Sequence, residues 1–172
     1  MPHVLLGLGA NLGDRLSSLE KAVAALATLG PVRRSGWYET EPVGMPGAPL
    51  FLNGAVSLDT RLGPEELFEE TRKIEEELGR ARTNAECKMQ SAKCKMAEQV
   101  YSSRTIDIDI LFYGHESIEL PGLHIPHPQL EGRAFVLVPL AEIEPDFRHP
   151  GLGASVAELA MRAGTAGVRK AA

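Results

Sequence analysis

Two aspartates in the stretch Arg104-Thr-Ile-Asp-Ile-Asp-Ile110 have the type and spacing to act together. Alternate residues of a β-strand point to the same face, so Asp107 and Asp109 would lie side by side with their Cα atoms roughly 7 Å apart. The isoleucines would then take the opposite face, as a core requires. Converging carboxylates repel each other unless a cation lies between them, and Mg²⁺ commonly takes one or two carboxylates together with water and substrate phosphates. The pattern fits a magnesium site, and it also fits a half-buried strand with a solvated acidic face.

Four arginines before and after this strand suit phosphate oxygens. Arg80 and Arg82 follow a predicted helix, Arg104 opens the aspartate strand, and Arg133 lies further along the chain. Each alone would most simply be a solvated surface residue, but four planar guanidinium groups around two carboxylates favour a polyphosphate site. The chain has no G-x-x-x-x-G-K-S/T motif, and its GLGANLG stretch lacks G-x-G-x-x-G spacing, so neither a P-loop nor a dinucleotide-binding turn is predicted.

Length and composition favour one globular domain over residues 1–172, and the order of its predicted elements favours the α+β class. The formal net charge of −5 gives no basic footprint for nucleic acid. No apolar stretch is long enough to span a membrane, and the first residues lack the basic region of a signal peptide. Cys87 and Cys94 do not suggest a secreted disulfide framework. We therefore expect a cytoplasmic protein without nucleic-acid or membrane partners.

Hydrophobic periodicity predicts the order strand, helix, strand, strand, helix, strand. The predicted strands cover residues 3–9, 32–40, 50–59 and about 104–113, and the predicted helices run from just after Asp14 to Gly30 and from Pro64 to Gly79. This order is typical of a ferredoxin-like unit, with helices on one face of a largely antiparallel sheet. Many such domains are only binding modules, so the order alone does not predict chemistry.

Further elements are expected after the aspartate strand. A short apolar piece at 117–120 could pair with that strand, a loop is expected at 121–128, and helices are expected within 129–143 and near 154–163. Before the strand, residues 85–98 read AECKMQS and AKCKMAE, which resembles a duplicated heptad. We interpret residues 83–103 as a long loop insertion with two free thiols rather than as a metal site.

Several stretches of the chain resemble, in order, those of the 6-hydroxymethyl-7,8-dihydropterin pyrophosphokinase family of folate biosynthesis. They are GLGANLGDR, YETEPVG, FLNGAV, IEEELGRAR, RTIDIDILFYG, IPHPQLEGRAFVLVPL and EIEPDFRHP. The resemblance covers most of the chain apart from residues 83–103 and the tail. It implies a ferredoxin-like fold and the transfer of pyrophosphate from ATP to the hydroxymethyl group of the pterin, with release of AMP.

The resemblance also implies roles for particular residues. Asp107 and Asp109 would hold two Mg²⁺ ions, and Arg80, Arg82 and Arg104 would bind phosphates during catalysis. The implied ATP-binding residues are Arg80, Arg104, Ile110, His124, His127 and Arg133. The implied pterin-binding residues are Thr40, Glu41, Pro42, Val43, Phe51, Asn53 and Phe135. Glu75 matches a family position near the site.

The residues themselves support some of these roles more than others. An asparagine in the middle of a strand is otherwise unfavourable, and the Asn53 amide matches the donor and acceptor edge of a pterin. Phe51 and Phe135 could flank a flat ring, although the pattern alone places Phe135 more readily in a core. His127 could be a neutral hydrogen-bonding partner for the nucleotide, or a loop histidine held between two prolines.

The chain departs from the family in one place. The family commonly has Arg-Trp-Gly-Pro-Arg before the aspartate strand, whereas this chain has Val-Tyr-Ser-Ser-Arg at 100–104. Tyr101 could replace the aromatic residue, and Lys88, Lys93 or Lys95 could supply charge. Two alternatives stay open: another Mg²⁺-dependent phosphoryl or nucleotidyl transferase, and a binding domain without chemistry. We expect a monomer whose partners are the small molecules ATP and the pterin.

Overall fold

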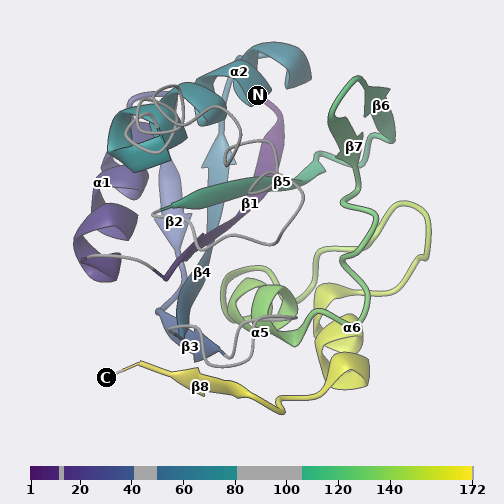
Figure 1. Ribbon diagram of the computed structural model, residues 1–172. Coiled ribbons are helices and arrows are strands. Elements are labelled where there is room, and N and C mark those ends of the chain that lie inside the picture. Colours follow the sequence, from purple (N-terminus) through teal and green to yellow (C-terminus); the bar gives the residue numbers. More distant parts are fainter. Residues whose placement is uncertain (12–13, 41–49, 81–105, 172) are drawn as a thin grey trace, which may run out of the picture.

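The computed structural model describes residues 1–11, 14–40, 50–80 and 106–171, and a six-stranded antiparallel sheet lies at its centre (Figure 1). The strands of this sheet are β1 (His3–Ala10), β2 (Val32–Arg34), β3 (Tyr38–Thr40), β4 (Phe51–Asp59), β5 (Asp107–Tyr113) and β8 (Val168–Lys170). The strand order is β5-β1-β4-β3-β8, and β2 also pairs with β4. This arrangement, in which β1 lies between β5 and β4, confirms the predicted ferredoxin-like α+β fold.

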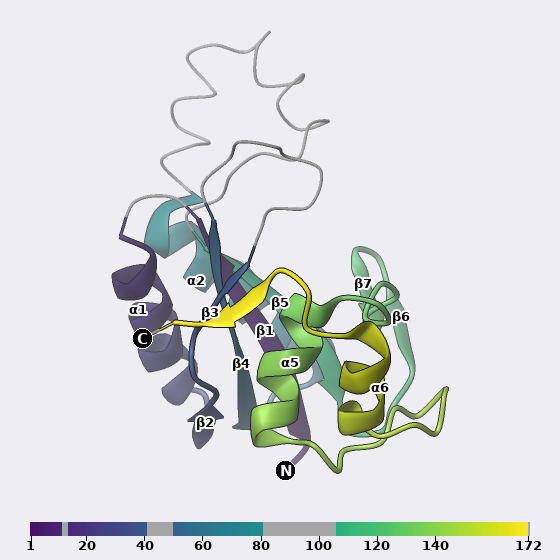
Figure 2. The same cartoon turned by 90° about the horizontal axis from the view of Figure 1, so that it is seen from below.

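Helices cover both faces of the sheet (Figure 2). They are α1 (Arg15–Ala27), α2 (Pro64–Glu75), α5 (Ala134–Ile143) and α6 (Val156–Ala163), and α2 continues into a π-helical turn, η1 (Glu76–Arg80). One hydrophobic core lies between the sheet and α1 with α2, and a second lies between the sheet and α5 with α6. The expectation of helices on one face therefore holds for α1 and α2, while the C-terminal helices close the other face.

The helix starts follow from their first residues. The Asp14 carboxylate accepts the Ser17 N–H at 3.1 Å and caps α1. Pro64 begins α2, where its fixed φ suits the first turn and its missing N–H is not needed. Ser155 and Glu158 form a reciprocal capping box at the start of α6. Each of these helices therefore begins with its first N–H groups partly satisfied.

The prediction of one continuous strand over 32–40 is wrong. Two short strands, β2 and β3, pair with β4 on either side of Ser35–Trp37. Ser35 donates its N–H to the Ala55 carbonyl, and its side-chain hydroxyl accepts the Ala55 N–H, both at 2.9 Å. The Trp37 ring lies over Gly54, where a Cβ would be 2.3 Å from the ring. The Ser35 hydroxyl thus accepts the N–H that a main-chain carbonyl would accept in a continuous strand pair, and the strand is interrupted.

Three other predictions about elements need correction. Residues 118–120 form β6 (Ile118–Leu120), which pairs with β7 (Leu123–Ile125) rather than with the aspartate strand, and β7 lies in the segment predicted as loop. The chain does not leave its helix at Gly79, because the π-helical turn continues to Arg80. Strand β8, which no pattern predicted, pairs with β3 at the edge of the sheet.

Candidate active site

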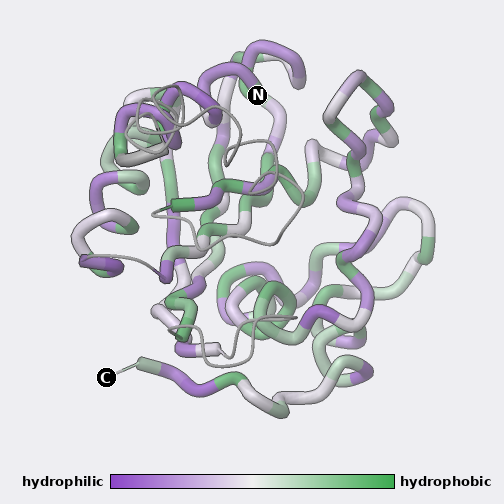
Figure 3. Tube along the Cα trace, in the orientation of Figure 1, coloured by the Kyte–Doolittle hydropathy of each residue, from purple (hydrophilic) through white to green (hydrophobic). Residues whose placement is uncertain are grey.

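Asp107 and Asp109 lie at the start of β5, on the face of the sheet opposite α1 and α2. Ile108 and Ile110 alternate with them and are buried in the core beneath those two helices. Because neighbouring side chains on a strand point to opposite faces, the two carboxylates share the other face. Both aspartates are partly exposed, and the beginning of β5 alternates in hydropathy (Figure 3). The predicted placement of the acidic and apolar side chains on β5 is confirmed.

Two glycines of β1 lie beside the aspartates. In the antiparallel register, Gly7 pairs with Asp109 and Gly9 pairs with Asp107. On the other side of β1, Gly9 pairs with Asn53 of β4. The surface of β1 between the acidic pair and β4 therefore carries no side chains at these two positions.

Asn53 is buried in the middle of the sheet and its amide is held by a neighbouring strand. Its Nδ2 donates to Thr40 Oγ1 at 2.5 Å, and both residues are less than a tenth exposed. Phe51, two residues earlier on β4, is partly exposed and pairs with Thr40 across the strands. A carboxamide has two donor hydrogens and an acceptor oxygen, so the bond to Thr40 leaves donor and acceptor capacity for a ligand.

His127 lies near Asp107 and is anchored at two points. Its main-chain N–H donates to the Leu111 carbonyl at 3.1 Å, and its Nδ1 accepts the Gln129 N–H at 3.2 Å. Burial lowers the pKa of His127, the Arg133 charge lowers it further, and the Asp107 charge opposes this without reversing it. With a lone pair on Nδ1 and a lowered pKa, the neutral ring carries its proton on Nε2, where it can be donated.

Arg133 stands at the N-terminal end of α5, directly before the first helical residue. It hydrogen-bonds the Gln129 side chain, and its guanidinium carbon lies 5.5 Å from the centre of the Phe135 ring. Phe135 is partly exposed and is not part of either core cluster, so its interpretation as a core residue is not supported. The ring and the cation form one stacked unit at the helix start.

The remaining ATP-binding candidates lie in two different environments. Ile110 is 4% exposed and its side chain belongs to the core, so a nucleotide contact would use its main chain on β5, the edge strand. His124 is exposed on β7 and pairs with Glu119 of β6.

Several predicted site residues lie outside the described part of the chain. They are Glu41, Pro42, Val43, Arg82 and Arg104, together with Cys87 and Cys94, the loop lysines Lys88, Lys93 and Lys95, and Tyr101. For Arg80 the structure gives the main chain, at the end of η1. Glu75 is 3% exposed on α2. The roles suggested for these residues stay predictions.

The acidic pair fits Mg²⁺ better than a metal that needs a protein cage. Among the described residues, no group of three or more His, Cys, Asp and Glu side chains is placed to hold a metal ion. Zn²⁺ in structural sites takes four protein ligands, whereas Mg²⁺ accepts one or two carboxylates and fills its shell with water and phosphate oxygens. Asp107 and Asp109 are the residues that would hold it.

Arg15, the first residue of α1, was not predicted as a functional residue, although it ends the GLGANLGDR stretch. Its Nη1 donates to the Leu50 carbonyl at 2.8 Å, and its Nη2 lies 3.2 Å from a carboxylate oxygen of Glu39. Leu50 directly precedes Phe51, and Glu39 directly precedes Thr40. One guanidinium group therefore fixes the main chain before Phe51 and the strand that carries Thr40.

A second network ties α5 to β3 and β8. Tyr38 donates its hydroxyl to Glu142 at 2.6 Å, and the same carboxylate accepts the Gly36 N–H and lies 3.3 Å from the Lys170 ammonium. Burial of Tyr38 and its bond to Glu142 raise its pKa to about 12. Burial acts to raise the pKa of Glu142, but the bonds from Tyr38, Gly36 and Lys170 outweigh it and lower the pKa. Helix α5, whose N-terminal end carries Arg133 and Phe135, is thus held at its C-terminal end.

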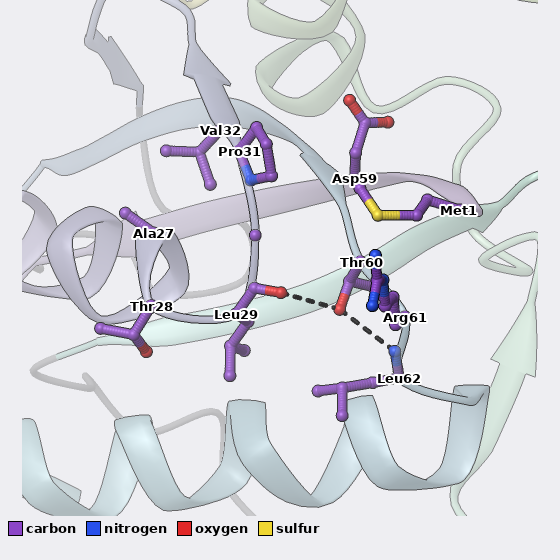
Figure 4. A pocket seen from close by; sticks show the side chains of 11 residues that line it. Met1, Ala27, Thr28, Leu29, Pro31, Val32, Asp59, Thr60, Arg61 and Leu62 are labelled. Carbon is purple, nitrogen blue, oxygen red and sulfur yellow. Dashed lines mark hydrogen bonds between the residues drawn. The ribbon is translucent and has the colours of Figure 1, made fainter.

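Figure 4 shows a hollow whose lining includes none of the residues of the aspartate face. It measures about 620 Å³ and is lined by residues that include Met1, Pro31, Asp59 and Arg61. Asp59 pairs with His3, six residues along β1 from Gly9, which is about 20 Å at the rise of a strand. Thr60 bridges its wall by hydrogen bonds with the Leu29 carbonyl and the Leu62 N–H. The chemistry of the aspartate face therefore does not involve this hollow.

None of the described helices combines the length and the apolar character needed to cross a bilayer.

Comparison with known proteins identifies a group of similar chains. Residues 5–145 match the 7,8-dihydro-6-hydroxymethylpterin-pyrophosphokinase (HPPK) family. The chain is similar to the 2-amino-4-hydroxy-6-hydroxymethyldihydropteridine pyrophosphokinase of Synechocystis sp., with 38% identity over 158 residues, 90% of this chain and 73% of the relative. The enzyme of the same name from Bacillus subtilis is 43% identical over 141 residues, 80% of this chain and 75% of the relative.

Solved structures share the fold at much lower identity. The wild-type HPPK-DHPS of Plasmodium falciparum superposes with a TM-score of 0.66 and 15% identity, covering 94% of this chain and 44% of the other. An HPPK-DHPS in complex with substrates gives a TM-score of 0.63 at 16% identity, covering 93% of this chain. The chain spans less than half the length of these solved proteins. They support the α+β architecture described above.

Proposed function

Because this chain belongs to the 7,8-dihydro-6-hydroxymethylpterin-pyrophosphokinase family, we propose that its aspartate face is the active site, with Asp107 and Asp109 as the magnesium ligands. The enzyme transfers pyrophosphate from ATP to the hydroxymethyl group of 6-hydroxymethyl-7,8-dihydropterin, releases AMP and serves folate biosynthesis.

The acidic pair would bind two Mg²⁺ ions against the triphosphate. Bound there, the ions would neutralise charge on the phosphate oxygens during the transfer. The aspartates contribute rigid placement, because they extend from a strand whose other face is core. The cations would also offset the repulsion between two carboxylates that lie on the same face of one strand.

The nucleotide would lie along β5 and the start of α5. His127 would donate its Nε2 proton to a phosphate or ribose oxygen, since its Nδ1 accepts the Gln129 N–H. Arg133 would pair with phosphate oxygens from the helix start, and Ile110 would contribute main-chain atoms. Arg80, Arg82 and Arg104 would add phosphate contacts, and His124 would lie at the outer limit of the nucleotide site.

The pterin would occupy the β4 side of the same face. Asn53 and Thr40 would read its polar edge, Phe51 and Phe135 would flank the ring, and residues 41–43 would add main-chain contacts. The hydroxymethyl oxygen would then attack the β-phosphorus and AMP would leave. Catalysis would come mainly from positioning and charge neutralisation.

One observation carries this proposal. Gly9 pairs with Asp107 on one side and with Asn53 on the other, so Asp107 and Asn53 lie two strands apart, roughly 10 Å. That span would bring a hydroxymethyl group and a metal-bound phosphate together across β1, which has no side chain at Gly9.

The test is AMP release from ATP with and without 6-hydroxymethyl-7,8-dihydropterin, at varied Mg²⁺. Release that requires the pterin supports the proposal. Release with an unrelated alcohol, and not with the pterin, would point to another phosphoryl transferase. No release with either acceptor would favour a binding domain without chemistry. We further propose that the enzyme works as a cytoplasmic monomer, which gel filtration at working concentration would test.

A further inference from the structure

Gly9 lacks a side chain where a side chain would collide with Asn53. A Cβ built on Gly9 would lie 2.5 Å from Asn53 Oδ1 and 3.7 Å from Phe51 Cδ1. Real Cβ atoms essentially never come within 3.0 Å of another heavy atom, so either the amide or the strand would have to move. Gly9 lies within the regular extended strand β1, so its backbone conformation alone does not require glycine. The requirement is for space.

The Asn53 amide has little freedom to move away. Its Nδ2 is bonded to Thr40 Oγ1 at 2.5 Å, and the residue is 7% exposed. If the amide swung away from a methyl group on β1, the bond to Thr40 would break or both groups would shift. A methyl group at position 9 would therefore alter the polar edge that the pterin is expected to meet.

We propose that Gly9 is a positioning residue of the pterin site: its bare Cα allows the Asn53 carboxamide to lie across β1, with Nδ2 on Thr40 and Oδ1 over Gly9. The inference rests on the proposed function, in which Asn53 reads the pterin. Strand β1 would then set the orientation of the Asn53 amide, although it offers no side chain at Gly9 to either substrate.

The same strand supplies a matched control. Gly7 points to the same face two residues earlier and pairs with Asp109. A Cβ on Gly7 would lie 3.5 Å from Leu111 Cδ1, which is an ordinary van der Waals contact. Both positions are glycines in one central strand, so replacing either by alanine makes the same change of propensity. They differ in whether the added methyl meets Asn53.

The experiment measures pterin binding by calorimetry, with Mg²⁺ and a non-hydrolysable ATP analogue present, for Gly9→Ala, Gly7→Ala and Asn53→Ala. We expect Gly9→Ala to weaken pterin binding about tenfold or more, as the loss of a buried hydrogen-bond partner would. It should leave binding of the analogue alone within about twofold of wild type, and Gly7→Ala should leave both within about twofold. In steady-state assays, Gly9→Ala should raise KM for the pterin more than it lowers kcat.

A double-mutant cycle separates this role from a general loss of structure. In an Asn53→Ala background there is no amide to displace, so adding Gly9→Ala should change pterin affinity by less than about twofold. Equal effects in both backgrounds, or wild-type pterin affinity in Gly9→Ala, would overturn the inference. If Gly9→Ala alone does not fold, Gly9→Ala/Asn53→Ala must fold, and its failure would also overturn it.

The proposed function fails in a different way. If Asn53→Ala binds the pterin as wild type does, Asn53 does not read the pterin, whatever happens at Gly9. If Asn53→Ala loses pterin affinity and Gly9→Ala does not, the proposed site stands and only the role of Gly9 is lost.

Discussion

Asp107 and Asn53 flank the same residue: both pair with Gly9 of β1, one from β5 and one from β4. The two residues are 54 positions apart in the sequence, and the central strand of the sheet fixes their separation. A carboxylate and a carboxamide are thereby held on one face of the sheet, as the proposed transfer between two bound substrates would require.

Replacing Asp107 by alanine should cut turnover by at least about 100-fold, because metal-ion charge stabilisation is worth several kcal/mol in the transition state. The fold should survive, since Asp107 is partly exposed and its removal leaves no core cavity. Steady-state AMP release over a Mg²⁺ titration measures the loss, and a thermal melt checks the fold. Asp146→Ala, which removes an exposed carboxylate elsewhere, should behave like wild type. Normal turnover in Asp107→Ala would refute the metal assignment.

Arg15 should affect the pterin and not the nucleotide. Arg15→Ala removes the bonds to Leu50 and Glu39 that hold the strands before Phe51 and Thr40. We expect KM for the pterin to rise about three- to tenfold, in line with the loss of one or two charge-assisted bonds that are partly screened by solvent, while KM for ATP changes little. Arg15→Lys should recover part of the loss, because lysine keeps the charge but not the fork.

The control for Arg15 is Arg34→Ala. Arg34 lies 3.3 Å from Glu20 and stacks on Trp37, so it also makes an ion pair and a ring contact on this sheet. It pairs with Val56 on β4, which is three residues from Asn53. Arg34→Ala should therefore leave KM for the pterin unchanged. Equal increases for both variants would mean that loss of stability, and not position, is responsible.

The sequence predicted the aspartate strand better than it predicted the outer strands. Alternation alone placed Asp107 and Asp109 on the face opposite Ile108 and Ile110, because the two-residue repeat of a strand is easy to recognise where one face is apolar. Strand β8 was not predicted, because three residues are too few to show the alternation of a strand. The interruption at Ser35 was not predicted, because a serine hydroxyl that accepts a main-chain N–H does not change the hydrophobic pattern of the sequence. The importance of Gly9 depends on register across three strands, which a single sequence does not reveal.

His127 should support ATP binding as a neutral donor. His127→Ala should weaken binding of a non-hydrolysable ATP analogue about three- to tenfold, as one hydrogen bond of ordinary strength would. Its pKa is lowered from 6.5 by burial and by Arg133, so the ring is already uncharged at neutral pH. The ratio of wild-type to variant affinity should be the same at about pH 7 and about pH 8. A ratio that falls as the pH rises over this interval would show that the charged ring is the binding form.

Two tyrosines allow the anchor of α5 to be compared with a neutral hydrogen bond. Tyr38 donates to the Glu142 carboxylate and Tyr113 donates to the Leu62 carbonyl, each at 2.6 Å. Tyr38→Phe should lower the free energy of unfolding by about 1.5–2 kcal/mol and Tyr113→Phe by about 1 kcal/mol, because hydrogen bonds to charged groups are stronger. Urea denaturation at neutral pH measures both.

The larger loss of stability expected for Tyr38→Phe than for Tyr113→Phe should depend on the charge of Glu142. The pKa of Glu142 is lowered from 4.5 in the folded protein, so its contribution is fully present above about pH 4.5 and is lost as the pH falls through the folded value. The effects of the two phenylalanine variants should therefore converge as the pH falls below about 4.5. A difference between them that does not shrink over this range would show that packing, and not the carboxylate, is responsible.

Two histidines should change the pH dependence of stability in opposite directions. Burial acts to lower the pKa of His3, but its hydrogen bonds and charge interactions with Asp59 and Glu144 raise it above 6.5 overall. Its contribution is therefore fully present below pH 6.5 and is lost as the pH rises through the folded value. Burial lowers the pKa of His149 below 6.5, so that contribution is present above pH 6.5 and is lost as the pH falls.

Urea denaturation of wild type, His3→Gln and His149→Gln from about pH 5.5 to about pH 8.5 tests this pair. The stability difference between wild type and His3→Gln should shrink as the pH rises, because deprotonation weakens the bridge from β1 to Asp59 and Glu144. The difference for His149→Gln should grow, because the neutral Nδ1 accepts the Gly151 and Leu152 N–H groups at 3.0 and 3.1 Å. Differences that move in the same direction would contradict the assignment of a charged ring at His3 and a neutral one at His149.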